Sequence, residues 1–141
     1  MTAESVSLHP VVLCVGDTTY LDYGGILAKR DGYGPQGNGG NGLLLHSGLA
    51  VEPDQGQPLG LLWQKLWHRQ HRAQPPEDET PAQKQQRRAQ ARKVQRARPF
   101  VEKESYRWVE ARTTVEPQVS PPTRVIHVFY REGHIAAVFE Q

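Results

Sequence analysis

The chain has 141 residues, enough for one domain of ordinary size or for part of a larger one. Hydrophobic residues make up 37% of it, and the formal net charge is only +2, so net charge alone identifies no partner. The apolar run near the N-terminus is too short for a signal peptide or a membrane span. Because a lone buried thiol, here Cys14, is typical of a reducing compartment, we expect a cytoplasmic protein with no membrane partner and no disulfide framework.

The first predicted strand is Val11–Val15, a continuous apolar run that is mostly β-branched. Such a run is typical of a strand buried on both faces, at the centre of a mixed sheet. The run stops at Gly16, so Asp17 is expected where a central strand leaves the core, a usual position for catalytic carboxylates in open α/β sheets. Taken alone, the stretch favours a simpler interpretation, a turn in which Asp17 accepts hydrogen bonds from the amides of Thr18 and Thr19.

A glycine-rich segment follows at residues 31–42 and contains a literal G-x-G-x-x-G at Gly32–Gly37. A dinucleotide-binding motif opens a helix directly after a strand, but a proline and further glycines prevent a helix here, so we interpret the segment as a loop. Two apolar runs come next, at residues 43–52 and 59–67, separated by proline, glycine and aspartate. They predict an antiparallel hairpin, with His46 as a core or edge residue rather than a ligand.

Residues 73–99 are expected to form a connector, rich in proline and acids up to residue 81 and basic afterwards. The basic part consists of good helix formers, with seven cations and no acid between residues 82 and 98. Four of the cations recur at every fourth residue and would stack along one helix face: Lys84, Arg88, Arg92 and Arg96. The segment Lys84–Arg98 has no apolar stripe, so it predicts a solvated helix or a disordered arm. It either binds DNA phosphates or is merely a soluble connector.

After the connector, the pattern predicts an amphipathic helix at Glu102–Arg112, a strand at Arg124–Phe129 and the start of a last helix at Ile135–Glu140. The expected fold is α/β: a three-stranded antiparallel meander, a helix, a parallel fourth strand and a helix, which is the ribonuclease H-like arrangement. The fourth strand would lie beside the first, with Asp17 and residue 130 about 4.8 Å apart. Two carboxylates at that spacing can hold a pair of divalent ions, and Mg²⁺ prefers such oxygen ligands.

Three parts of the sequence, in this order, resemble one family. The first is Val15–Tyr23 with its Asp-Thr-Thr, and the second is the pair Leu45–Val51 and Leu59–Trp67, with His-Ser and Gly-Leu-Leu. The third comprises Glu104–Trp108 and Val125–Ile135. Together they resemble the catalytic domain of DDE transposases of the cut-and-paste bacterial insertion-sequence type, insertion-sequence family four.

The resemblance implies that residues 1–141 are a partial ribonuclease H-like catalytic domain, incomplete at the C-terminus. It implies that Asp17 is a metal-binding catalytic acid, with Mg²⁺ as the cofactor and DNA as the substrate of phosphodiester hydrolysis and strand transfer.

The sequence departs from the family pattern at the second catalytic aspartate, which Tyr130 replaces, and at His134, where the family usually has an acid. A phenol has a pKa of ~10 and stays neutral at pH 7, so Tyr130 cannot replace a carboxylate as a magnesium ligand. The family's third acid, a glutamate, lies beyond the last residue of this chain, and Glu132 is poorly placed to substitute.

We therefore expect an inactive remnant of an enzyme, although the resemblance by itself leaves activity open. A first alternative is a non-catalytic DNA-binding module that uses the basic helix and interferes with an intact transposase. A second is an unstable product, because an incomplete sheet leaves an open apolar face and an unpaired edge, both of which favour aggregation.

Overall fold

The computed structural model describes residues 2–24, 32–37, 39–71 and 74–130. Its helices and strands, in chain order, are α1 (Thr2–Val6), β1 (Val11–Asp22), β2 (Gly34–Pro35), β3 (Asn41–Val51), β4 (Pro58–Trp67), α2 (Pro81–Ala97), α3 (Arg107–Val115) and β5 (Arg124–Phe129). Short 3-10 turns lie at Phe100–Glu102, Glu104–Tyr106 and Glu116–Gln118. The α/β class is confirmed, while the last predicted helix, Ile135–Glu140, lies outside the described residues.

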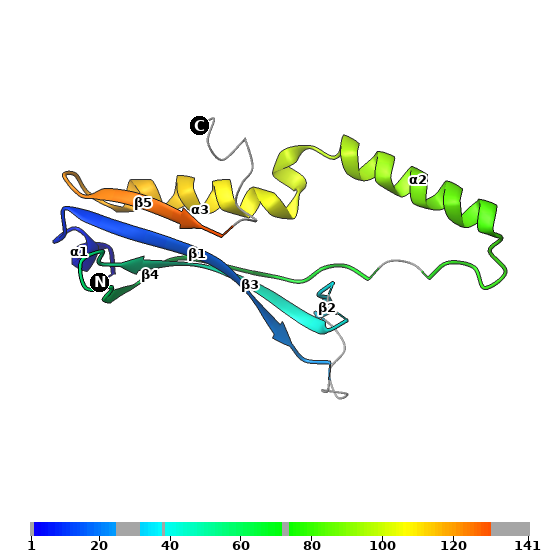
Figure 1. Ribbon diagram of the computed structural model, residues 1–141, viewed down its shortest axis with the longest axis horizontal. Coiled ribbons are helices and arrows are strands. Elements are labelled where there is room, and N and C mark those ends of the chain that lie inside the picture. Colours follow the sequence, from blue (N-terminus) through cyan, green and yellow to red (C-terminus); the bar gives the residue numbers. More distant parts are fainter. Residues whose placement is uncertain (1, 25–31, 38, 72–73, 131–141) are drawn as a thin grey trace.

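The strands form one mixed sheet (Figure 1). β3 pairs antiparallel with β1 on one side and with β4 on the other, and the two-residue β2 pairs with its first residues. β5 runs parallel to β1 and beside it, from Val11↔Arg124 to Gly16↔Phe129. The predicted meander and the parallel return of the last strand to the first are therefore confirmed.

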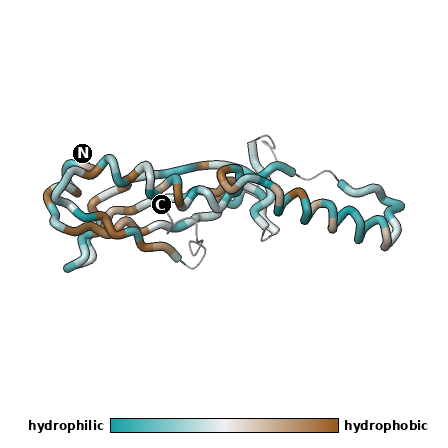
Figure 2. Tube along the Cα trace, turned by 90° about the horizontal axis from the view of Figure 1, so that it is seen from above, coloured by the Kyte–Doolittle hydropathy of each residue, from teal (hydrophilic) through white to brown (hydrophobic). Residues whose placement is uncertain are grey.

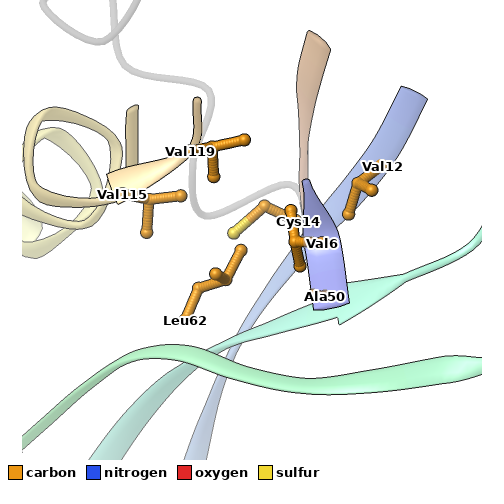
Figure 3. Packing of buried hydrophobic residues seen from close by; sticks show 7 residues of the cluster. All are labelled: Val6, Val12, Cys14, Ala50, Leu62, Val115 and Val119. Atoms are coloured by element: carbon orange, nitrogen blue, oxygen red, sulfur yellow. The ribbon is translucent and has the colours of Figure 1, made fainter. Parts of the chain in front are cut away.

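Helices α1 and α3 pack on the same side of the sheet, which we call the covered face. Alternate residues of β1 and β3 point toward it and are buried, among them Val12, Cys14, Leu44 and Ala50. The main core cluster unites these strands with both helices (Figure 3), and its buried members are Val6, Val12, Cys14, Ala50, Leu62, Val115 and Val119. A second cluster at the other end of α3 consists of Trp108 and Val109, with Phe100, Tyr106 and Phe129 against them.

The other side, which we call the open face, is also apolar, but no described residue packs over it. Its apolar side chains are Val11, Leu13, Val15, Leu21, Leu43, Leu45, Leu49, Val51, Leu61, Leu66, Ile126 and Val128. All of them are partly or largely exposed, and on β3 and the first half of β1 they alternate strictly with buried residues. The prediction that Val11–Val15 is buried on both faces is therefore wrong within the described residues, because both packed helices lie on one side.

The amphipathic helix begins later than predicted. Residues 100–106 form two 3-10 turns separated by Lys103, whose backbone is extended, and α3 starts only at Arg107. The extended residue lets the chain fold back so that the rings of Phe100 and Tyr106 pack edge to face, 5.7 Å apart. α3 then buries Trp108, Val109, Ala111 and Val115 against the sheet.

Candidate functional site

Asp17 lies within β1 rather than beyond its end. The predicted strand end at Gly16 is wrong, since pairing with β3 continues as far as Asp22↔Gly42. Gly16 marks close packing instead of a turn, because a Cβ there would come within 3.0 Å of the Trp108 ring. Asp17 is exposed, pairs with Ser47 and projects from the open face, opposite to Thr18.

Tyr130 follows β5 directly and is 66% exposed. The last parallel pair is Gly16↔Phe129, so Asp17 and Tyr130 are the next residues of the two strands at the same level of the sheet. The neighbouring position thus holds a phenol where the resemblance expects a carboxylate. Nowhere in the described ranges do three or more His, Cys, Asp or Glu residues gather as a metal site. Glu132 and His134 lie outside those ranges. The described donor set at this point is one carboxylate, and it does not by itself fit a two-ion magnesium centre.

On the covered face, Thr18, which follows Asp17 in the sequence, is part of a buried polar cluster. Thr18 Oγ1 lies 2.8 Å from His46 Nδ1 and accepts a hydrogen bond from Arg107 Nε at 3.3 Å. The direction of the Thr18–His46 hydrogen bond is set by the tautomer of His46, since the hydroxyl can both donate and accept. The His46 ring packs edge-on to Trp108, with 4.2 Å between ring centroids.

His46 is fully buried, which confirms its expected place in the core. Burial, and secondarily the positive charge of Arg107, lower the pKa of His46 to about 4, although the carboxylate of Asp17 acts in the opposite direction. His46 is therefore neutral at pH 7 and has a packing role. Its cluster fixes the orientation of Thr18, the residue after the candidate catalytic acid.

A second polar group joins the end of β4 to the turn before α3. The Arg69 guanidinium binds Glu104 with two hydrogen bonds, Nε to Oε1 at 2.7 Å and Nη2 to Oε2 at 2.8 Å, and Trp67 Nε1 donates to Oε1 at 3.2 Å. These hydrogen bonds, with that from Arg69 the strongest, lower the pKa of Glu104. Arg107 lies over the rings of both Trp67 and Trp108, 5.7 and 5.2 Å from their centroids.

These groups line a cavity of about 480 Å³ between the sheet and the segment that leads from α2 to α3. Three of its lining residues are cations, Arg69, Lys103 and Arg107, and one is an acid, Glu104. The resemblance included Glu104–Trp108 but gave these residues no role. Their partners lie 35 and 89 residues away in the chain, so local spacing carried no signal for the cluster.

The basic segment is an α-helix, which decides between the helix and the disordered arm. Thr80 caps it: its hydroxyl accepts from the Gln83 amide at 3.3 Å, while the Gln83 side chain accepts from the Thr80 amide at 2.9 Å. Every residue of α2 is exposed. The helix projects away from the sheet (Figure 1) and is largely hydrophilic (Figure 2).

The four cations predicted to share a face of α2 are confirmed on a regular helix. No ion pair to the described residues engages Lys84, Arg88, Arg92 or Arg96, whereas Arg87 pairs with Glu79 at 2.7 Å. The stripe of four spans about 18 Å at a rise of ~1.5 Å per residue. It offers a row of accessible positive charge with no apolar side to bury.

Comparison of the chain with models of known protein families and with curated proteins gave no match. In the described ranges, no helix combines the length and the apolar character that crossing a bilayer requires.

Proposed function

We propose that this chain is a DNA-binding protein derived from the catalytic domain of a DDE transposase of insertion-sequence family four, without strand-cleavage activity. The observation that carries the proposal is the stripe on α2, whose four residues are exposed: Lys84, Arg88, Arg92 and Arg96. Duplex DNA has one charge per ~1.7 Å of axis, so a stripe about 18 Å long reaches several phosphates. Contacts of this kind bind DNA without reading its sequence.

The sheet supports the transposase origin. A meander followed by a strand that returns parallel to the first is the order expected of a ribonuclease H-like sheet, and the described strands have this order. Asp17 lies on the central strand β1, next to the strand that ends before Tyr130. The resemblance in Asp17-Thr18-Thr19 and the strand pairing both support a transposase origin.

The proposed loss of DNA strand cleavage rests on Tyr130, the residue beside Asp17 on the neighbouring strand. Since Tyr130 is a neutral phenol at pH 7, it does not supply the second metal-binding carboxylate. A module that binds transposon-end DNA without cutting it would compete with an intact transposase for the same DNA. Magnesium-dependent nicking of DNA by the pure chain, abolished by Asp17→Ala, would contradict this part of the proposal.

The DNA-binding proposal is tested by measuring affinity for a duplex of about 20 base pairs over a range of salt concentrations. Each phosphate contact contributes roughly 0.9 to the slope of log K against log salt. We expect the triple variant Arg88→Ala, Arg92→Ala, Arg96→Ala to lower the slope by about 2 to 3 and to weaken binding strongly at low salt. The matched control, with lysine at the same three positions, retains the charge and should retain the slope.

An unchanged affinity and slope in the alanine variant would refute α2 as the DNA-binding element. Because all three residues are exposed and alanine is an excellent helix former, the substitutions should not disturb folding. Circular dichroism of the variants checks this directly, so a loss of binding with intact helix content assigns the effect to charge.

A further inference from the structure

The open face has the composition of an interface rather than of an ordinary protein surface. Four of its residues are among the most exposed large apolar side chains of the described chain: Leu61 at 46%, Leu66 at 56%, Ile126 at 46% and Val128 at 40%. They come from both outer strands, β4 and β5, and the partly exposed leucines and valines of β1 and β3 lie between them. A polar row of Asp17, Ser47 and Gln64 crosses β1, β3 and β4 on this face. The apolar side chains between this row and the level of Val11 form a continuous patch, and such a patch marks a site of association.

The size of the face is suited to one partner of similar size. Four strands at ~4.8 Å spacing and about seven residues at ~3.3 Å rise, the stretch of β1 from Val11 to Asp17 beside which β5 lies, give a patch of about 440 Å². Two such patches in contact would bury about 900 Å², the size of a weak, transient interface. Two sheets that face each other pack ~10 Å apart with interdigitating side chains, as in a β-sandwich.

The charges on the face point to its partner. Among the described strand residues directed to this side, only Asp17 and Arg124 are charged. Arg124 is level with Val11 through their pairing, and so lies six residues, about 20 Å, from the level of Asp17. One face therefore has a negative charge toward one end and a positive charge at the other, with apolar side chains between.

A second copy turned end for end matches this pattern. Consider two copies whose open faces meet, related by a twofold axis that lies between the two sheets and runs across their strands. This axis places Asp17 of each copy at the same level along the strands as Arg124 of the other copy, with a sideways offset of one strand spacing. In such an isologous contact each pair occurs twice. The axis then passes at the level of Leu13, Val15, Ile126 and Val128, so the apolar side chains meet at the centre and the charges lie toward the rim.

We propose that two copies of this chain associate through their open faces as a closed homodimer, with Asp17 of each copy paired with Arg124 of the other. This interface is separate from α2 and is not needed for the proposed DNA binding. A failure of dimerisation and a failure of DNA binding are therefore distinguishable.

The test is the mass of the full chain in solution, measured by sedimentation velocity between about 1 and 100 µM, a range that brackets the micromolar affinities of small interfaces. We expect a dimer that dissociates on dilution. Ile126→Lys should abolish it, because the substitution places a cation at the centre of the apolar contact. The matched control is Val101→Lys, at an exposed apolar side chain outside the sheet (62% exposed), and it should leave the dimer intact.

A charge-reversal cycle tests the orientation of the two copies. Asp17→Arg or Arg124→Asp alone should weaken the dimer about ten-fold, since each creates two repulsive pairs. The double variant should restore the affinity to within about three-fold of the original. A merely destabilising substitution would not be rescued in this way.

Three results would overturn the proposal. The first is a monomer throughout the concentration range, which would mean that something other than a second copy covers the face. The second is a dimer indifferent to Ile126→Lys. The third is open-ended aggregation without a defined dimer, which would support the interpretation of the face as an exposed hazard.

Discussion

The two faces of the sheet use the same strands and nearly the same residue types, yet only one of them is buried. On β1, the covered face receives Val12 and Cys14, while the open face receives Leu13 and Val15. The difference does not lie in hydrophobicity. It comes from what packs above each face, since α1 and α3 both pack on the face of the described sheet that presents Val12 and Cys14.

This comparison separates two properties that a run of apolar residues combines. Composition determines which side chains are suited to burial, and the packing partner determines which of them are buried. An exposed apolar side of an otherwise regular sheet therefore indicates an association that the described chain does not itself provide. Substitutions on the two faces should consequently differ in what they destabilise: folding on the covered face, association on the open face.

The largest effect on folding is expected for Trp108→Ala. Trp108 is 1% exposed, and its ring lies 4.2 Å from that of His46 and 4.9 Å from that of Phe129, centroid to centroid. Its removal leaves a large cavity between α3 and the sheet and should lower the free energy of unfolding by about 3–5 kcal/mol. Urea denaturation at low protein concentration, where association is minimal, measures the loss.

The matched substitution on the open face is Leu61→Ala, which removes an apolar side chain that is 46% exposed. We expect a loss of folding stability below about 1 kcal/mol, because little contact is given up and no enclosed cavity forms. If Leu61→Ala destabilised the dilute protein as much as Trp108→Ala, the described contrast between the faces would be wrong.

After Trp108→Ala, the next largest effect is the acid sensitivity that His46 confers on the covered face. Its pKa is about 4 in the folded chain and about 6.5 when unfolded, so between these values the unfolded chain binds more protons. Stability is then full above pH 6.5 and is lost as the pH falls. The loss between pH 7 and pH 5 should be about 2 kcal/mol. Chemical denaturation across this range measures it. His46→Gln, which cannot titrate, should reduce the dependence, and the part that remains should include His127, whose pKa burial also lowers.

The fold followed from local pattern to a large extent. Strand positions, the hairpin and the parallel return of Arg124–Phe129 could be predicted because apolar periodicity and turn residues are local signals. The predictions were wrong where tertiary contacts determine the local structure. Gly16 was interpreted as a strand end, but it lies under the Trp108 ring, and the chain supplies that contact more than 90 residues later. The prediction that β1 is buried on both faces was wrong for the same reason.

The candidate site likewise has a part that local sequence patterns predict and a part that only tertiary contacts determine. The stripe on α2 was predictable because a spacing of four is a property of one helix, and its exposure followed from the absence of an apolar side. The cluster around Thr18 was not predictable, since His46 and Arg107 reach Thr18 from 28 and 89 residues away. The resemblance predicts that Asp17 is a catalytic acid, but only the strand register shows that its side chain lies on the open face.

The smallest effects on the free energy of unfolding are expected from neutralising the acid of two ion pairs, Glu104 with Arg69 and Glu79 with Arg87. Glu104 receives hydrogen bonds from Arg69 and Trp67 and joins the end of β4 to the turn before α3, so Glu104→Gln should lower the free energy of unfolding by up to about 1 kcal/mol, after allowance for solvent screening. Glu79 pairs with Arg87 of α2 at equally short distances, but no residue of that helix is buried. Glu79→Gln should therefore leave the denaturation midpoint unchanged. An equal effect of the two substitutions would mean that α2 folds cooperatively with the sheet, and its stripe would then be held in place rather than free to adjust to DNA.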